Sequence, residues 1–330
     1  MPNKRPFTKD DLNLDCDREV DRITVRIREA IAKICRRRGV VIGVSGGIDS
    51  SVTLALCVKA LGKDRVAALL MPERDSDSET LRLSRLVSDH FGIPAIEEDI
   101  TRILEAVGFY SRYIEAVRNV VKEYGEDWKS KIVSSVDGEK QHYTFFSIVV
   151  QSPDGKVIKK RLPLKAYLEV VAATSFKQRT RKMMEYYHAD RLHFAVAGTP
   201  NRLEYDQGFF VKNGDGAADI KPIAHLYKTQ VYQLAEYLDI PLEIRKRPPT
   251  TDTYSLPQGQ DEFYFSLPYD KMDLCLYGKN NHIGPDLVGR AIGLTEEQVE
   301  KVYKDIDQKR STTKYLHEAP ILIEKIRPFA

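Results

Sequence analysis

The chain alternates between runs of apolar residues and stretches in which apolar residues recur every three or four positions. A continuous apolar run indicates a buried strand, and the three-to-four spacing indicates a helix with one buried face. In the first hundred residues the pattern predicts a helix over residues 17–38, a strand over 40–44, a helix over 50–61, a strand over 65–71, a helix over 77–91 and a strand over 94–98. Because apolar strands that alternate with helices are typical of a parallel sheet covered on both faces, we predict an α/β fold with a doubly wound parallel sheet.

The pattern changes between residues 126 and 164, where three segments are rich in β-branched and aromatic residues. They cover residues 132–136, 142–151 and 156–160, and the pairs Asp137-Gly138 and Asp154-Gly155 separate them. Asp-Gly is a strong signal for a hairpin turn. We therefore predict an antiparallel β-hairpin insertion over residues 126–164, whose aromatic residues either pack the insertion or form a lid over a ligand.

The helix and strand pattern then returns. It predicts a helix over residues 164–187, a strand over 192–197, a loop over 198–218, a helix over 226–238, a loop over 247–261 and a helix over 295–307. No repeat or low-complexity tract interrupts the chain. We expect a single domain over residues 1–330, with a helical region over residues 262–330.

Charge and cysteine usage exclude several classes of protein. Lys and Arg number 51 against 48 Asp and Glu, so the chain lacks the basic excess of a dedicated nucleic-acid binder. The longest apolar runs are far too short to span a membrane, and we expect no signal peptide because the first residues lack an apolar core. The four cysteines form no C-x-x-C pair, which argues against a disulfide scaffold or a zinc ribbon and favours a reducing, cytoplasmic location.

The strongest chemical signal follows the predicted strand over residues 40–44. This 45–51 loop reads Ser45, Gly46, Gly47, Ile48, Asp49, Ser50 and Ser51. Glycines let a backbone approach a ligand closely, and the N-terminus of a helix presents unpaired N–H groups to an anion. The loop matches neither the P-loop pattern nor G-x-G-x-x-G. It predicts a phosphate site at the carboxyl end of a strand, and the structural alternative is a turn capped by Ser and Asp.

Two carboxylates and one lysine are predicted to lie near this loop. Asp49 and Glu204 each follow a predicted parallel strand, so we expect them at the same edge of the sheet. Mg²⁺ on a polyphosphate takes few protein ligands, and two carboxylates suit it. Lys228 lies near the inward line of its helix, where a lysine needs a partner such as a phosphate. The structural alternatives are a helix-start carboxylate for Glu204 and a lysine that extends to solvent for Lys228.

The 45–51 loop resembles the S-G-G-x-D-S pyrophosphate loop of the N-type ATP pyrophosphatases. The resemblance implies a Rossmann-like fold of the adenine nucleotide alpha-hydrolase-like type and an enzyme that releases pyrophosphate while it adenylates a substrate. Further segments resemble those of NAD synthetases in the same order: G-T-x-N-x-x-E at 198–204, K-x-G-D-G at 212–216 followed by Asp219, L-Y-K-x-Q at 226–230 and P-P-[ST] at 248–250. Upstream of them, K-Q-R-T-R at 177–181 resembles the basic helix K-A-R-x-R of the family. The chain is thus similar to ammonia-dependent NAD synthetases from residue 45 to about residue 250.

The resemblance implies a reaction and roles for individual residues. ATP and the carboxylate of deamido-NAD would give an acyl-adenylate and pyrophosphate, and ammonia would then give NAD and AMP. Asp49, Asp215 and Lys228 would be catalytic, with Asp215 accepting a proton from ammonium, while Asp49 and Glu204 would hold Mg²⁺. The residues expected to bind ATP or pyrophosphate are Ser45, Gly46, Gly47, Ser50, Ser51, Arg179, Thr199, Lys228 and Thr250, and those expected to bind the acceptor are Lys212 and Asp219.

The same resemblance implies partners. NAD synthetases of this size are homodimers with the dinucleotide site at the interface, so we expect a homodimer. No amidotransferase domain precedes Ser45, and we therefore expect free ammonia, or ammonia from a separate glutaminase partner, as the nitrogen source.

Three departures from the family pattern leave the acceptor open. Ser175 occupies a position where the family commonly has Asn, the 126–164 region is longer than in ordinary members, and residues 307–311 match the basic tail only loosely. A paralogue that amidates another carboxylate, such as a sugar acid or a secondary metabolite, is the main alternative. A nucleotide-binding regulator without chemistry is a second alternative, and the presence of all the expected catalytic residues disfavours it.

Overall fold

A parallel sheet forms the centre of the protein. The structure is a computed structural model that describes residues 6–136, 144–249, 254–256, 259, 264–265 and 267–324. The sheet has the strand order β3-β2-β1-β7, with β1 at Val40–Gly43, β2 at Val66–Leu70, β3 at Ala95–Glu97 and β7 at Ala195–Ala197. All pairings are parallel, and Val40 is paired with Val66 on one side and with Ala195 on the other.

The order of the strands reverses at β1. The chain first moves outward from β1 through β2 to β3, and it later returns to place β7 on the opposite side of β1. Such a reversal opens a crevice at the carboxyl ends of the two strands, which is where open α/β sheets bind ligands. The segments that follow β1 and β7 therefore flank the expected binding site.

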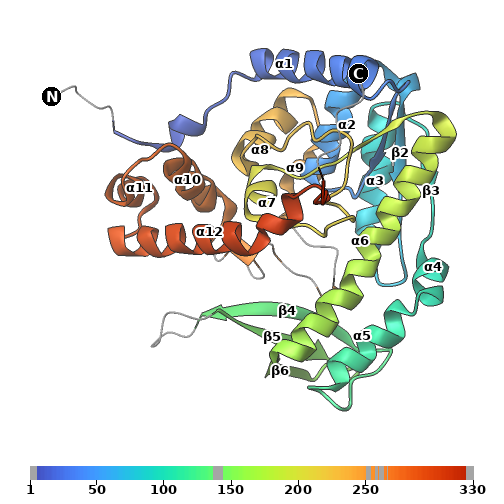
Figure 1. Ribbon diagram of the computed structural model, residues 1–330, viewed down its shortest axis with the longest axis vertical. Helices are drawn as coiled ribbons and strands as arrows, with labels where there is room; N and C mark the ends of the chain where they lie inside the picture. The colour runs from blue at the N-terminus through green and yellow to red at the C-terminus, as the bar shows by residue number, and fades with distance from the viewer. Residues whose placement is uncertain are drawn as a thin grey trace.

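Helices cover both faces of this sheet (Figure 1). Val40 and Ile42 join a core with α1, α2, α3 and α8, whereas Val41 points to the other face and joins a core with α4, α5 and α6. The covering helices are α1 Cys16–Glu29, α2 Ile48–Leu61, α3 Ser78–His90, α4 Thr101–Ala106, α5 Phe109–Arg118, α6 Leu164–Leu192, α8 Lys228–Tyr237 and α9 Leu242–Lys246. The predicted doubly wound α/β sheet is confirmed.

A second, antiparallel sheet is inserted between α5 and α6. Its order is β4-β5-β6, with β4 at Lys129–Val136, β5 at Thr144–Gln151 and β6 at Val157–Arg161. Ile132 and Ile148 are paired across it and are fully buried in the core that contains α5 and α6. Gly155 has a φ of 86° in the second turn, as its Asp-Gly pair predicts, whereas Asp137-Gly138 lies outside the described residues. The predicted antiparallel insertion is confirmed.

The C-terminal helices form a third core. They are α10 Tyr269–Asn280, α11 Pro285–Ile292 and α12 Glu296–His317, and they pack with α7 Arg202–Gln207 and the 3-10 helix η1 Lys9–Leu12. Leu203, Leu276 and Ile306 are among its buried residues. Figure 1 shows these helices on the opposite side of the molecule from α6.

Several boundaries differ from the sequence prediction. The α1 segment ends at Glu29 and continues as a π-helical segment, η2 Ala30–Ile34, short of the predicted end at residue 38. Helix α6 extends to Leu192, where His193 adopts a left-handed conformation with φ of 57°, so β7 begins only at Ala195. The sequence pattern assigns Leu192 to the strand because it is apolar and adjoins apolar residues. In the structure Leu192 is the last residue of α6 and packs against the core.

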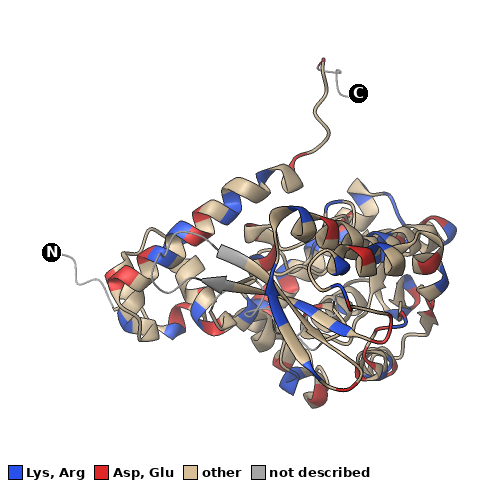
Figure 2. Cartoon of the chain, turned by 90° about the horizontal axis from the view of Figure 1, so that it is seen from below, with Lys and Arg blue, Asp and Glu red and all other residues tan. Residues whose placement is uncertain are grey.

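Other elements were not predicted at all. Helices α4 and α5 and the 3-10 helix η3 Lys63–Arg65 were not anticipated, and α7 lies in the predicted 198–218 loop. Helix α12 runs ten residues beyond its predicted end, from residue 307 to His317. No helix in the described part of the chain is long and apolar enough to cross a membrane. Lys and Arg are interspersed with Asp and Glu over the helices (Figure 2), which matches the nearly balanced composition.

Candidate active site

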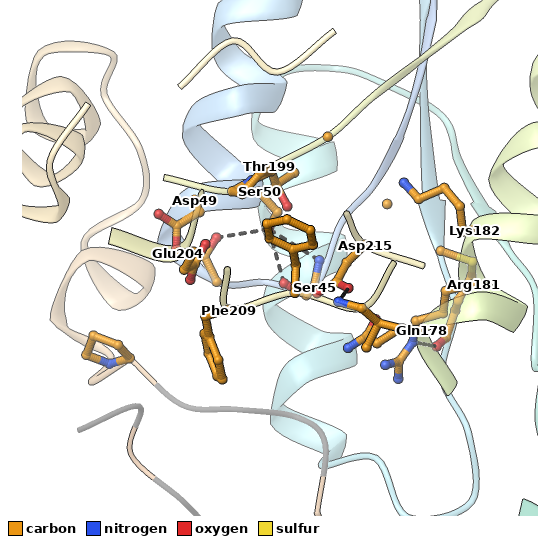
Figure 3. A pocket seen from close by; sticks show the side chains of 18 of the residues that line it. Ser45, Asp49, Ser50, Gln178, Arg181, Lys182, Thr199, Glu204, Phe209 and Asp215 are labelled. Atoms are coloured by element: carbon orange, nitrogen blue, oxygen red, sulfur yellow. Dashed lines mark hydrogen bonds between the residues drawn. The ribbon is translucent and has the colours of Figure 1, made fainter. Parts of the chain in front are cut away.

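A cavity of about 590 Å³ opens at the carboxyl edge of the parallel sheet. Its walls come from the segments after β1, β2 and β7, from α6 and α8, and from the last turns of α12. Figure 3 shows side chains from several of these elements pointing into one common space. The cavity thus occupies the crevice that the reversal of strand order creates.

The 45–51 loop forms one wall of this cavity. Gly46 has a φ of 65°, and a Cβ atom there would lie 2.8 Å from the backbone oxygen of Thr80 and from Cβ of Leu83. Only glycine fits this turn, which directs the chain into the N-terminus of α2. Ser50 Oγ lies 3.3 Å from both the backbone N and the Oγ of Ser45. The backbone N–H groups and the serine hydroxyls at this helix start could hold an anion.

Not every residue of the loop reaches the cavity. Ser45, Gly47, Asp49 and Ser50 line it, but Gly46 and Ser51 are not among the lining residues. The Ser51 side chain is fully buried, and its hydroxyl donates to the carbonyl oxygen of Gly47 at 2.8 Å. Gly46 and Ser51 therefore shape the loop rather than face the cavity.

Residues from three segments meet beside the loop. Lys228 Nζ forms an ion pair with Oδ2 of Asp49, and Nδ2 of Asn201 donates to Oδ1 of the same carboxylate at 3.1 Å. Asn201 also caps α7, because its Oδ1 accepts from the backbone N–H of Glu204 at 3.2 Å. The structure therefore brings Asp49 and Glu204 together, as their positions after parallel strands predicted, and places Lys228 beside them from the start of α8.

Lys228 is buried, with 1% of its surface exposed, yet it is held in the charged form. Burial alone would lower the pKa of Lys228, but the carboxylates of Asp49 and Glu204 outweigh burial and raise the pKa above its ordinary value. A buried lysine needs such partners to remain protonated. The site thus presents a fixed positive charge next to the 45–51 loop.

Asp49 and Glu204 could provide oxygen ligands for a divalent cation. Both line the cavity, and carboxylate oxygens are the donors that Mg²⁺ prefers. Within the described residues, no group of three or more His, Cys, Asp and Glu side chains is arranged to hold a metal by itself. A cation here would therefore take the rest of its ligands from water and phosphate, as Mg²⁺ on a nucleotide does.

A second group of charged residues faces the cavity from α6 and the 211–215 turn. Lys182 Nζ and Glu185 Oε2 are 2.5 Å apart, and both side chains are buried. Burial raises the pKa of Glu185, although the nearby Lys182 opposes the shift. Asp215 is close enough to interact electrostatically with both residues. The cavity wall here therefore contains the buried Glu185 carboxylate, the half-buried Asp215 and a lysine.

Asp215 differs from a solvent-exposed turn aspartate. Its Oδ1 accepts a hydrogen bond from the backbone N–H of Val211 at 2.7 Å. Burial raises the pKa of Asp215, against the opposing effects of this hydrogen bond and of Lys182. A carboxylate with a raised pKa is a better base than an exposed one.

The remaining predicted residues are placed as follows. Arg179 and Thr199 line the cavity, and Arg179 Nε donates to the carbonyl oxygen of Lys212 at 3.3 Å. Lys212 also lines it, and its ammonium donates to the carbonyl oxygens of Tyr315 and Glu318 at 2.6 and 3.1 Å. Asp219 is not among the lining residues.

The carboxylate of Asp219 instead binds the backbone of the edge strand β7. Its Oδ2 accepts a hydrogen bond from the backbone N–H of Val196 in β7 at 2.7 Å. Thr250 lies outside the described residues. Ser175 lines the cavity, and its hydroxyl donates to the carbonyl oxygen of Val171 at 2.8 Å.

Sequence reasoning missed several residues of the site. Asn201 carries a signal, because N-x-x-E before a helix is a capping pattern. Glu185 and Lys182 carry none, since a charged pair within a long helix usually faces solvent. For the aromatic residues of the insertion, the sequence leaves two alternatives, packing within the insertion or a lid over a ligand. Phe146 stacks on Tyr167 with ring centroids 4.3 Å apart, and both rings line the cavity. The inserted sheet therefore reaches the site through one of its aromatic side chains.

Comparisons with known proteins agree with this arrangement. The chain is 58% identical over 324 residues to the NH(3)-dependent NAD(+) synthetase of Rhizobium meliloti, covering 98% of this chain and 97% of the relative. It is 59% identical over 315 residues to the protein of the same name from Mesorhizobium japonicum, covering 96% and 99%. The solved NH3-dependent NAD synthetase from Campylobacter jejuni matches in fold, with a TM-score of 0.62 and 21% identity over 94% of this chain and 100% of that chain.

The family model locates the match within the chain. The model of the NAD synthase family matches residues 19–125 and 147–315. Residues 126–146, which contain β4 and the start of β5, fall outside it. The match includes the 45–51 loop, the Asn201–Glu204 cap, the Asp215 turn and Lys228, so most of the cavity wall comes from matched segments, whereas Phe146 lies outside them. This chain belongs to the NAD synthase family.

Proposed function

We propose that this protein amidates the carboxylate of deamido-NAD with ATP and ammonia and releases NAD, AMP and pyrophosphate. The observation that carries the proposal is the meeting of the 45–51 loop, the Asp49–Lys228 pair and Glu204 at one cavity. The relatives that are 58% and 59% identical are named as ammonia-dependent NAD synthetases, which favours deamido-NAD over another carboxylate.

In the first step, an oxygen of the acceptor carboxylate attacks the α-phosphorus of ATP. The bond between this phosphorus and the bridging oxygen of the β-phosphate breaks, and pyrophosphate leaves as the acyl-adenylate forms. We assign the pyrophosphate to the 45–51 loop, with Ser45, Gly47 and Ser50 in contact with it and with Gly46 and Ser51 shaping the turn. The Lys228 ammonium stabilises the negative charge that develops on the leaving group.

Other residues complete the nucleotide site. Arg179, Thr199 and Thr250 are proposed to contact the phosphates or the nucleoside of ATP. Asp49 and Glu204 would hold Mg²⁺, which when bound offsets part of the charge of the triphosphate. Lys212 and Asp219 are proposed to act on the acceptor. Lys212 would contact it directly from the cavity wall, whereas Asp219 would act indirectly, through its hydrogen bond with the backbone N–H of Val196 in β7.

In the second step, ammonia attacks the acyl carbon of the adenylate. The bond between this carbon and the bridging oxygen breaks, and AMP leaves with that oxygen. Asp215 is proposed to accept a proton from ammonium, because its buried carboxylate has a raised pKa. The ammonia comes from solution or from a separate glutaminase partner.

We also propose that the protein works as a homodimer in the cytoplasm. Apolar side chains on one side of α6 are exposed: Leu164 at 73%, Leu168 at 54%, Met183 at 54% and Tyr187 at 56%. Exposed apolar side chains on a long helix are typical of a surface that a partner covers. The four cysteines are free thiols, which agrees with a reducing compartment.

The test is to incubate the protein with ATP, Mg²⁺, ammonium and deamido-NAD. We expect equal amounts of NAD, AMP and pyrophosphate. Asp49→Asn should lower the rate by about 10²–10³-fold, by analogy with the loss of one charge-stabilising group, whereas exposed Asp64→Asn should leave it unchanged. AMP formation with another acid but none with deamido-NAD would select the paralogue, and no turnover with any acid would select the regulator.

A further inference from the structure

The N-terminus of α8 is capped by a residue from another helix. Oδ1 of Asp273 accepts from the backbone N–H of Lys228 at 3.1 Å, and Oδ2 accepts from the backbone N–H of Thr229 at 2.6 Å. Asp273 belongs to α10 and is fully buried. The two oxygens of one carboxylate therefore take the first two N–H groups of the helix.

This arrangement is unusual for a helix start. The first N–H groups of a helix have no partner within the helix, and a Ser, Thr, Asp or Asn side chain just before the helix normally accepts from them. The residue in that position here is Tyr227, whose own backbone N–H donates to Oε1 of Gln230 at 3.1 Å. Asp273 thus supplies from a distant segment the negative charge that a helix N-terminus favours.

The capped residue is also the one whose side chain forms the central ion pair of the site. The backbone of Lys228 is bonded to Asp273, and its ammonium is bonded to Asp49. A lysine side chain is long and flexible, so its charge is accurately placed only if the backbone that carries it is fixed. Val231, Leu234 and Ala235 anchor the later turns of α8 in the core, while the carboxylate of Asp273 holds its first turn.

We propose that Asp273 is a positioning residue for the reaction, which holds the first turn of α8 and thereby directs the ammonium of Lys228 at Asp49 and the triphosphate. The inference rests on the function proposed above for Lys228. Asp273 does not line the cavity, so its effect passes through Lys228. It gives α10 a part in catalysis without contact with substrate.

The test compares Asp273→Asn with Asp270→Asn at pH 8. Asparagine keeps one acceptor and turns an NH₂ group toward an N–H donor, so one capping bond is lost. Asp270 lies on the same helix with its side chain 45% exposed, and its nearest cation is Lys9 at 4.0 Å, which makes it the matched control. We expect kcat to fall about 10- to 100-fold in Asp273→Asn, with KM for ATP changed less than threefold, because small misplacements of a catalytic group lose rate.

A double-mutant cycle separates positioning from a general loss of structure. If Asp273 acts through Lys228, adding Asp273→Asn to Lys228→Met should lower kcat by less than twofold beyond Lys228→Met alone. Losses that multiply in the double variant would overturn the inference. If Asp273→Asn does not fold, Asp273→Ser replaces it, because serine accepts one hydrogen bond and places no NH₂ group against the helix.

The outcomes also distinguish this inference from the proposed function. A wild-type protein that forms NAD, together with an Asp273→Asn variant that retains the kcat of Asp270→Asn, would overturn only the role of Asp273. A wild-type protein that forms no AMP with any acid would overturn both. Circular dichroism and thermal unfolding of each variant show whether the compared proteins are folded.

Discussion

At the scale of single residues, the site depends on a buried charged side chain whose charge is compensated by neighbouring carboxylates. Lys228 is almost inaccessible to water and would be costly as an isolated charge. The carboxylates of Asp49 and Glu204 compensate for that cost and keep the ammonium protonated. The result is a positive charge in a largely water-excluded position, where a bound phosphate would be stabilised more strongly than in water.

Asp215 should be needed for the second chemical step but not for the first. In Asp215→Asn we expect NAD formation to fall by about 10²- to 10⁴-fold, because the group proposed to accept the proton of ammonium is lost. Exchange of pyrophosphate into ATP, measured with deamido-NAD and without ammonium, should stay within about threefold of the wild type. Equal losses in both assays would show that Asp215 does not act at the ammonia step.

Asp273 should leave a signature in the pH dependence of stability. Burial raises its pKa from 3.8 to about 7, although hydrogen bonds from Thr229 and Lys228 and the charge of Lys228 oppose the shift. The other titratable groups that face it are Tyr227 and Tyr269. Between pH 3.8 and about pH 7, Asp273 is protonated in the folded state but ionised in the unfolded state. The contribution of Asp273 to the free energy of unfolding therefore falls as the pH rises through this range.

The measurement compares the melting temperatures of the wild type and of Asp273→Asn, whose side chain cannot titrate. The melting temperature of Asp273→Asn minus that of the wild type should become more positive from pH 5 to pH 8, since only the wild type loses this contribution. Asp270→Asn serves as the control and should show a constant difference. A constant or falling difference for Asp273→Asn would contradict the raised pKa.

Residues of the site could be predicted from the sequence where a local sequence pattern marks their position. The 45–51 loop, Glu204 and Lys228 each lie at a recognisable place after a strand or on a helix face, and the structure brings them together. Lys182, Glu185 and Asp273 were not predictable, because each sits within a helix where a charged side chain ordinarily faces solvent. Their burial depends on which helix packs over which loop, and the sequence alone does not reveal that packing.

At the scale of elements, the turn before α2 should tolerate substitution less than a turn of the same backbone conformation elsewhere. Gly46 and Gly92 have φ values of 65° and 64°, so alanine at either position incurs a similar backbone penalty of about 1–2 kcal/mol. Nothing lies within 4 Å of a Cβ at Gly92, whereas a Cβ at Gly46 meets backbone atoms of Thr80 and Ser84 within 2.9 Å.

Gly46→Ala should therefore lower activity at least tenfold and weaken ATP binding, because the loop has to move to relieve the clash. Gly92→Ala should retain wild-type activity within twofold and lose only stability. Kinetics and thermal unfolding of the two variants provide the comparison. Equal activity in both would show that the conformation of the loop does not control the site.

The element boundaries show where sequence patterns fail. The buried strands β1 and β2 were predicted to within two residues because they are short, apolar and followed by turn residues. Helix α7 was missed because it is only six residues long and is specified by a cap rather than by periodicity. The end of α6 was misplaced because Leu192 is apolar and adjoins the strand, so no change in composition marks the boundary.

At the scale of the whole molecule, three cores and one cavity have to be arranged together. The cavity takes residues from both faces of the parallel sheet, from the inserted sheet and from the end of α12. The parallel sheet itself was predictable from alternation of strands and helices. For Phe146 the sequence left packing or a lid open. The contribution of the last turns of α12 was not predictable, because it depends on contacts between segments far apart in the chain.

The exposed apolar side of α6 should hold two copies of the chain together. Leu168→Glu places a charge on this side, so we expect the dimer to dissociate at micromolar concentration. Leu242→Glu, at an equally exposed apolar residue on α9, is the matched control and should stay dimeric. Light scattering during size-exclusion chromatography reports the mass, and a wild-type protein that is monomeric would refute the proposed dimer.

The fate of one oxygen atom tests the central claim most directly. Deamido-NAD labelled with ¹⁸O in its reacting carboxylate is converted with ATP and ammonia, and the AMP is analysed by mass spectrometry. If the carboxylate attacks the α-phosphorus in this cavity, the transferred oxygen remains on that phosphorus, so AMP should gain label while pyrophosphate should contain none. Unlabelled AMP, or label in pyrophosphate, would contradict adenylation of the acceptor.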